Sequence, residues 1–503
     1  MATLCKSLSL ILILMLWLGQ ASAQQDSAQS TDFYMIRFND ALDKAYVEAT
    51  LHGGHFSMAP IGASHLARGW QTWVQNLIAL SATGGTLPVE AGPDGGWIVD
   101  AQPESSIRLN YEVDLSFTRL PWPVGNEQAG QFTGDALYLV ARPLFIVSDV
   151  DRPARIRIQP PGNMIISSAW QRGDDGVFYA ENQTSLTSNS LVVGHHNEVR
   201  VSQDDFHVNL ALPGEAGGAA DAMRPVLSAA MADYLDMFPE TPARTFLMTF
   251  FYAPQDDGEA FSGSAAFTSQ EPVTATGRLI WANFIAHELM HHWNGQAIAS
   301  SERAPTAWFR EGGTEYLANL ALARGDVVDP QSWLRKAESH LGLYLLFASS
   351  PVWQEVTLES AGSNSGANRP GVYNGGWAAS LCLDARIRQA SADRRSLRDL
   401  MTLMYRRYAQ TGTRYTAADL ASAVSEIAGE DLDDYFRVHI QGTEPLPIRE
   451  CLAAFGLQII SKSYAGEAYL SADPEADGAA RQRLDSLLNH PGAHASLLAR
   501  SAP

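Results

Sequence analysis

The sequence predicts a multidomain protein of the α+β class, and two observations carry this prediction. The 503 residues are too many for one ordinary hydrophobic core, so two or three domains are expected. The hydrophobic pattern also changes along the chain, from a period of two residues before about residue 201 to helical periodicity after it. With 46% hydrophobic and 18% charged residues, the composition is that of a globular protein.

The first domain, residues 24–201, is predicted to be rich in β-strands. Ile107, Leu109 and Tyr111 alternate with polar residues, and turn sequences such as QPPGN at 159–163 separate runs of this kind. Such alternation is typical of sheets with one face in contact with water.

The second domain is predicted to span residues 202–329. Its expected elements are a helix at 219–238, a buried strand at 245–252, and two helices at 277–296 and 308–324.

Helical periodicity dominates residues 330–460, which form the predicted third domain. The remaining residues, 461–503, are polar, and we expect a weakly packed tail there. Within the helical domain, Cys382 and Cys451 both lie in apolar helical patterns. They could form a disulfide in an oxidising compartment or remain two buried thiols.

The first 23 residues have the pattern of a cleaved secretory signal. Lys6 precedes an apolar run at 8–18, and Ala21-Ser22-Ala23 follows it before a polar stretch. We therefore expect an exported protein, periplasmic or secreted, whose mature chain begins near Gln24.

No later segment has the roughly twenty apolar residues that a membrane span needs. A net charge of -20 argues against nucleic acid as a partner. The oligomeric state is not predicted.

The stretch HELMHHWNG at 287–295 lies on the helix expected at 277–296. Because an α-helix turns about 100° per residue, His287 and His291 lie on one face, and their imidazoles can converge on one metal ion. Glu288 lies on the flank of that face, where it can hydrogen-bond a water on the metal without being a ligand. This is the geometry of the H-E-x-x-H motif.

A catalytic zinc site needs a third protein ligand and one open position. The stretch WFREGGTEYLA at 308–318 offers Glu311, twenty positions after His291, on the next expected helix. Glu315 follows one turn later and could hold a ligand histidine by its other ring nitrogen. We therefore predict one Zn²⁺ per chain, held by His287, His291 and Glu311.

These two stretches resemble the gluzincin metallopeptidases, and the Trp293-Asn294 pair resembles the glycyl aminopeptidase family within them. VYNGGWAASLCLDARIR at 372–388 is similar to the Tyr-x-x-Gly helix of these enzymes, with matches at Tyr373 and Gly376. The resemblance implies a β-sandwich-like N-terminal domain, a thermolysin-like catalytic domain and a C-terminal helical domain. It also implies hydrolysis of peptide substrates by metal-activated water, with a preference for the amino end.

In this scheme Glu288 is the general base, and the hydroxyl of Tyr373 stabilises the developing oxyanion. The resemblance places substrate binding on FSGSAAFTS at 261–269, where Gly263 and Ser264 are the candidate residues. Ala266 falls about where the family has a glutamate that binds the free amine of the substrate, so we expect an altered amino-end specificity.

Two further questions stay open from the sequence. Glu259 or Glu271 could replace the missing amine-binding glutamate, and cleavage could be exo- or endopeptidic. Family members often carry a PDZ module, for which too few residues follow Ile460. The alternative function is a protein that binds metal and peptide, or another partner, without turnover.

Overall fold

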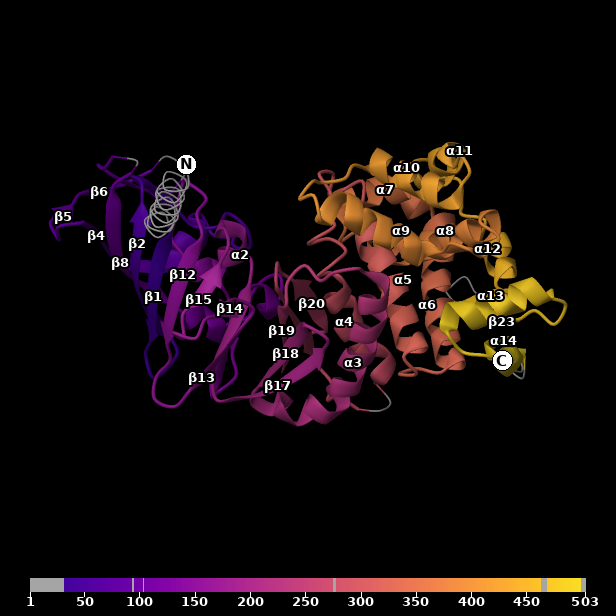
Figure 1. Cartoon of the computed structure of the whole chain (residues 1–503), viewed down its shortest axis with the longest axis horizontal. Helices are drawn as coiled ribbons and strands as arrows, with labels where there is room; N and C mark the ends of the chain where they lie inside the picture. Colours follow the sequence, from indigo (N-terminus) through magenta and orange to yellow (C-terminus); the bar gives the residue numbers. More distant parts are fainter. Residues whose placement is uncertain (1–30, 93–94, 103, 275–276, 463–467, 499–503) are drawn as a thin grey trace, which may run out of the picture. The chain divides into compact units, whose positions relative to one another are not determined.

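The computed structural model describes residues 31–92, 95–102, 104–274, 277–462 and 468–498 (Figure 1). The expected signal sequence at 1–23 lies outside these residues. The chain divides into two compact units, Met1–His196 and Asn197–Pro503. The mixed α+β class predicted from the sequence is confirmed, because strands dominate the first unit and helices the later part of the second.

The first unit is built from three sheets. The largest has eight strands in the order β14-β15-β12-β1-β2-β8-β4-β5, and two four-stranded sheets have the orders β13-β16-β10-β9 and β11-β3-β7-β6. In β8, Ile107, Leu109 and Tyr111 are buried while the residues between them are less so, as their alternation predicts. The strands are β1 (Asp32–Phe38), β2 (Lys44–His52), β3 (His55–Ser57), β4 (Val74–Ser81), β5 (Thr86–Leu87), β6 (Val89–Ala91), β7 (Trp97–Val99), β8 (Ser106–Asp114), β9 (Gly130–Phe132), β10 (Ala136–Val140), β11 (Val147–Ser148), β12 (Ala154–Gln159), β13 (Ile165–Ser168), β14 (Gln171–Arg172), β15 (Phe178–Ala180) and β16 (Ser190–Gly194). A short helix, α2 (Gln183–Thr187), precedes β16.

The second unit begins with a five-stranded sheet of order β17-β18-β19-β21-β20. Strands β18, β19 and β21 pair in parallel, and β20 pairs antiparallel with β21 at the edge of the sheet. Helices α3 and α4 pack against each other, and α4 also contacts β20 and β21. The bounds are β17 (His196–Gln203), β18 (Phe206–Pro213), β19 (Thr245–Tyr252), β20 (Asp257–Ala260), β21 (Ser264–Ser269), α3 (Ala220–Met237) and α4 (Arg278–Met290).

The rest of this unit is mainly helical, and Figure 1 shows helices α6 to α10 gathered in its orange part. Helix α6 begins at Pro330 because the side chain of Asp329 accepts a hydrogen bond from the amide of Ser332. The helices are α5 (Thr314–Arg324), α6 (Pro330–Ser349), α7 (Leu358–Ala361), α8 (Gly376–Ala390), α9 (Leu397–Met404), α10 (Ala417–Ala428), α11 (Asp433–Tyr435) and α12 (Ile448–Ala454), and the π-helical turns are η6 (Phe309–Gly313), η9 (Pro370–Gly375), η10 (Tyr405–Ala409) and η11 (Phe436–Ile440).

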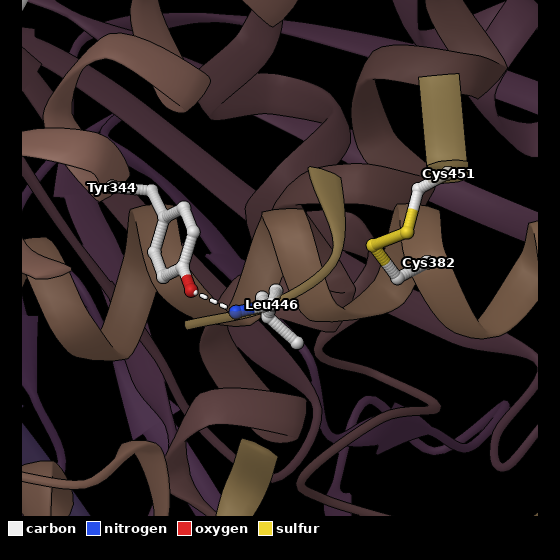
Figure 2. The surroundings of a disulfide bond; sticks show 4 residues. All are labelled: Tyr344, Cys382, Leu446 and Cys451. Carbon is white, nitrogen blue, oxygen red and sulfur yellow. Dashed lines mark hydrogen bonds between the residues drawn. A yellow bond between two sulfur atoms is a disulfide. The ribbon is translucent and has the colours of Figure 1, made fainter. Parts of the chain in front are cut away.

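Cys382 and Cys451 form a disulfide, so of the two alternatives open from the sequence the structure has the bonded one. The bond joins α8 to α12 (Figure 2). Near it, the amide of Leu446 donates a hydrogen bond to the hydroxyl of Tyr344, which ties the segment before α12 to α6.

The expectation of a weakly packed tail at 461–503 is corrected by the structure. Strands β22 (Leu457–Lys462) and β23 (Ala468–Ala472) form a two-stranded sheet, followed by helices α13 (Gly478–Leu488) and α14 (Ala493–Leu498). Leu470, Leu484 and Leu488 are fully buried, and β23 and α14 pack against α6. The composition of the segment is polar, but its few leucines are buried in the core of the second unit, and their burial anchors the segment.

In the residues that the structure describes, no helix is both long and apolar enough to cross a membrane.

Candidate metal centre and cleft

Helix α4 carries both histidines of the motif at its C-terminal end. His287 lies in its last turn and His291 caps it, so that their Nε2 atoms are 3.0 Å apart. The helix ends at Met290 and does not reach residue 296 as expected. The amides of His292 and Trp293 bond to the carbonyls of Leu289 and Met290, three residues back, and Gly295, with a φ of +113°, cannot resume a right-handed helix.

Glu311 approaches the two histidines from the π-helical turn η6. Its Oε2 atom lies 3.3 Å from Nε2 of His291 and 3.8 Å from Nε2 of His287. One ligand atom from each of the three residues lies within 4.8 Å of the others. Two imidazole nitrogens and one carboxylate are the ligands of many catalytic zinc sites, so this group fits the predicted ion. A π-helical turn is rare and frequently occurs at a functional site.

The other ring nitrogen of each histidine is held by a hydrogen-bond partner. Nδ1 of His287 lies 2.9 Å from Oε2 of Glu315, and Nδ1 of His291 lies 2.9 Å from the carbonyl oxygen of Asn294. Both partners are acceptors, so each Nδ1 can donate its proton to one of them, and each Nε2 is oriented toward the cluster. Glu315 therefore lies where the sequence reasoning expected it.

Glu315 is the centre of a buried polar network. The side-chain amide of Asn283 donates to both of its oxygens at 2.9 Å. Nε2 of His340 lies 3.1 Å and Nζ of Lys336 lies 3.7 Å from Oε1. Burial by itself raises the pKa of Glu315, but the contacts with His287 and His340 outweigh it and hold the pKa well below its usual range. The carboxylate is thus ionised and can keep the His287 ring in place.

Glu288 is buried beside the three candidate metal ligands, and burial raises the pKa of its carboxyl group. The edge strand β20 passes directly over it. A side chain at Gly258 would overlap the carboxylate of Glu288, so a larger residue there would force that carboxylate or the strand to move. A carboxylate with a raised pKa is suited to accept and return a proton.

Tyr373 lies on a second π-helical turn, η9, with its ring stacked at a centroid distance of 6.1 Å from that of His287. Burial and the nearby charge of Glu311 raise the pKa of Tyr373 well above its usual range. The phenol therefore stays protonated and can act as a hydrogen-bond donor.

The approach of η6 to the start of α8 depends on Gly312 and Gly376, because a side chain on either would overlap the backbone of the other segment.

Two cavities meet at these residues and share Gly258, His287, Glu288 and Tyr373 as walls. The first has a volume of about 210 Å³. The second has a volume of about 380 Å³. The residues that line only the first include Glu259, Ala260, Gln296, Arg303, Arg310 and Glu311. The residues that line only the second include Ile280, Phe284, Lys336, His340, Leu343 and Arg369.

The expected substrate-binding residues Gly263 and Ser264 do not line either cavity among the described residues. Ser264 is fully buried, and Gly263 accepts a hydrogen bond from the amide of Leu247 within the sheet. The cavity wall is instead the preceding strand, β20, because β20 is the edge of the sheet that faces α4.

The register of β20 and β21 shows which of the two candidate glutamates lies at the cavity. Glu259 pairs with Ala266 across the two strands, and Glu259 lines the first cavity. Glu271 is exposed and lines neither cavity in the described part of the chain. The sequence alone could not select Glu259, because cross-strand pairing depends on the turn at 261–263.

Lys336 and Arg369 also line the second cavity, and neither was predicted from the sequence. A signal for Lys336 is present, since Lys336, His340 and Leu343 follow one face of a helix at spacings of four and three residues. Nothing in the sequence indicates that this face meets the cleft.

Three comparisons relate the chain to known proteins. The model of the M61 glycyl aminopeptidase family matches residues 281–369, which contain the motif and Glu311. The crystal structure of an aminopeptidase N family protein from Idiomarina loihiensis matches with a TM-score of 0.72 at 17% identity, over 85% of this chain and 79% of that one. No curated protein sequence matches the chain. The family match supports a peptidase related to the glycyl aminopeptidases, and the structural match shows that the fold is similar to that of an aminopeptidase N family protein.

Proposed function

We propose that this relative of the glycyl aminopeptidases is a zinc-dependent peptidase that hydrolyses peptide bonds at the junction of the two cavities. The observation that carries the proposal is the convergence of His287, His291 and Glu311 beside Glu288 and Tyr373. Zinc, when bound, would make a water molecule acidic enough to act as a nucleophile near neutral pH.

The protein side chains have separate roles in this reaction. Glu288 accepts the proton of the attacking water and returns it to the leaving amine, for which its raised pKa is suited. The hydroxyl of Tyr373 donates a hydrogen bond to the carbonyl oxygen as that oxygen gains negative charge. Glu315 and the carbonyl of Asn294 hold the two histidine rings in orientation.

The experiment that tests this proposal is the exchange Glu288→Gln. The variant should bind one zinc per chain, as metal analysis of the purified protein would show, because Glu288 is not among the three clustered ligands. Its kcat should fall by a factor on the order of 10² to 10⁴, since a general base is lost. Undiminished turnover would exclude the assigned base, and absence of turnover in the wild-type protein would favour a metal-binding protein without catalysis.

We further propose that Glu259 binds the free amine of the substrate, which makes the enzyme an aminopeptidase with an altered anchor. Glu259 supplies a carboxylate on the wall of the first cavity, opposite Ala266. An ammonium group in such a recess needs a partner of opposite charge. A free-amine peptide should therefore be cleaved faster than its N-acetylated counterpart.

The exchange Glu259→Gln should remove that preference. Glu271→Gln is the matched control, because Glu271 is an exposed glutamate outside both cavities. If wild-type protein cleaves the acetylated peptide equally well, the chain is not an aminopeptidase.

We also propose that the protein is exported. The expected signal sequence at 1–23 supports this, and so does the disulfide between Cys382 and Cys451, because disulfides persist in oxidising compartments. Sequencing the N-terminus of the protein recovered from the extracytoplasmic fraction should give a start near Gln24. Recovery from the cytosol with Met1 intact would contradict export.

A further inference from the structure

The second cavity shares Glu288 and Tyr373 with the first and extends to residues of α4 and α6. Helix α4 contributes Ile280 and Phe284 to its wall, and α6 contributes Leu343. Ile280 is 56% exposed and Leu343 is 37% exposed. Large apolar side chains from two different helices thus face one recess, which would favour an apolar group as its occupant.

Two cations line the same cavity. The guanidinium of Arg369 lies over the ring of Tyr373, 4.3 Å from its centroid, and the side chain is exposed. Nζ of Lys336 lies 3.7 Å from Oε1 of Glu315. This distance is longer than the 2.9 Å contacts that the same carboxylate makes with Asn283 and His287. The ammonium of Lys336 therefore has hydrogen-bond donors left for a ligand.

The two cations of this cavity lie on one side of it, and two of its three carboxylates lie on the other. Lys336 lies on α6, and Arg369 lies next to η9, which packs against α6. Asp257 and Glu288 belong to β20 and α4, which form the other wall. The third carboxylate, Glu315 of α5, lies 3.7 Å from Lys336 and offsets part of the charge of that ammonium. A negatively charged group on a substrate would therefore be attracted mainly to Arg369, with Lys336 as a second donor, and would be repelled by Asp257 and Glu288.

We propose that the second cavity binds the residue that follows the scissile bond, and that it selects an apolar residue with a carboxylate held by Lys336 and Arg369. This assignment rests on the proposed function, because an amine anchor at Glu259 puts the amino end of the substrate in the first cavity. The apolar walls favour the α-carboxylate of a C-terminal residue over the side chain of an acidic one. The substrate class is therefore dipeptides that end in an apolar residue.

The first experiment compares three substrates with the zinc-loaded full-length protein. Glycyl-leucine has both the apolar side chain and the α-carboxylate, its C-terminal amide lacks the carboxylate, and glycyl-aspartate amide has only a side-chain carboxylate. We expect kcat/KM for glycyl-leucine to exceed that for its amide on the order of tenfold, as for one charge-assisted hydrogen-bonded pair. Equal values of kcat/KM for glycyl-leucine and its amide would overturn the proposal. If glycyl-aspartate amide is cleaved fastest, the site binds a side-chain carboxylate and the assignment to the α-carboxylate is wrong.

Variants then test the two cations. Lys336→Gln and Arg369→Gln should each bring the acid-to-amide ratio of kcat/KM toward one, whatever their effect on the absolute rate. Arg335→Gln is the control, because Arg335 is an exposed cation next to Lys336 that hydrogen-bonds Ser332 and does not line the cavity. A ratio that is unchanged in both Lys336→Gln and Arg369→Gln would contradict their role.

Binding measurements separate this proposal from the proposed function. In the Glu288→Gln variant, calorimetry should show that intact glycyl-leucine binds on the order of tenfold more tightly than its amide, without turnover. If the wild-type protein hydrolyses neither peptide but this difference in Kd is present, the peptidase assignment fails and the carboxylate site stands. If both peptides are hydrolysed and bound equally well, the carboxylate site fails and the peptidase assignment stands.

Discussion

Replacing Glu315 with glutamine should weaken zinc binding without removing any metal ligand. Oε2 of Glu315 lies 2.9 Å from Nδ1 of His287, and the side-chain amide of Asn283 donates to both carboxylate oxygens. Oε1 also lies 3.1 Å from Nε2 of His340. Both oxygens thus face donors, so the amide nitrogen of a glutamine at 315 would meet a donor in either orientation.

The size of the effect follows from this geometry. Loss of the partner that orients a ligand histidine typically costs 10-fold to 100-fold in metal affinity, which is about 1.4 to 2.8 kcal/mol. We expect Glu315→Gln to lie near the upper end, because the site is buried and the exchange adds an unfavourable donor–donor contact to the loss of charge.

Glu338→Gln provides a matched control for this measurement. Glu338 is also a buried glutamate, on the neighbouring helix α6, and its Oε1 accepts a hydrogen bond from the amide of Leu470 at 2.8 Å. A glutamine can keep that bond with its carbonyl oxygen.

The assay is competition for zinc with a chromophoric chelator, together with the melting temperature of each metal-free variant. We expect the zinc Kd to rise only in Glu315→Gln, while Glu338→Gln stays within about twofold of the wild type. A Kd for Glu315→Gln within about twofold of the wild type, or an equal weakening in Glu338→Gln, would refute the reasoning.

Three other exchanges have defined outcomes. Tyr373→Phe should lower kcat by a factor on the order of 10² to 10³ with little change in KM, since one donor to the oxyanion is lost; a change in KM alone would contradict that role. Gly258→Ala should reduce kcat while the zinc content stays at one per chain, because a methyl group at this position collides with Glu288. Turnover at the wild-type rate would show that β20 can move away without loss of activity. The double exchange Cys382→Ser with Cys451→Ser should lower the free energy of unfolding by about 4 kcal/mol, because the disulfide closes a loop with a sequence separation of 69 residues. Denaturant unfolding with and without reductant measures this difference. Equal stability of the variant and the wild type would contradict the prediction.

The metal ligands illustrate how far the sequence alone could go. The spacing of His287 and His291 is a local property of one helix, so the sequence predicts their convergence directly. Glu311 required a further assumption, that the next helix returns antiparallel to the first. The structure places Glu311 beside the histidines on a π-helical turn, which no pattern in the sequence indicates.

The residues that line the cleft depended on long-range packing, and fewer of them could be predicted from the sequence. Gly263 lies in the turn before β21 and Ser264 is buried in β21, whereas the neighbouring edge strand, β20, lines the cleft. Whether Glu259 or Glu271 faces the cavity was decided by the pairing of Glu259 with Ala266 across a turn.

The sequence by itself determined the class of fold, the two histidines with their glutamate, and the helix that carries them, because these depend on periodicities of two and about four residues. Only the tertiary structure decided which distant side chains meet them, namely Glu311, Tyr373 and the walls of the two cavities. The polar C-terminal segment shows the same division, since Leu470 and Leu484 are visible in the sequence but their burial depends on helices more than a hundred residues earlier. Contacts of that range follow from packing of whole elements, which local patterns do not encode.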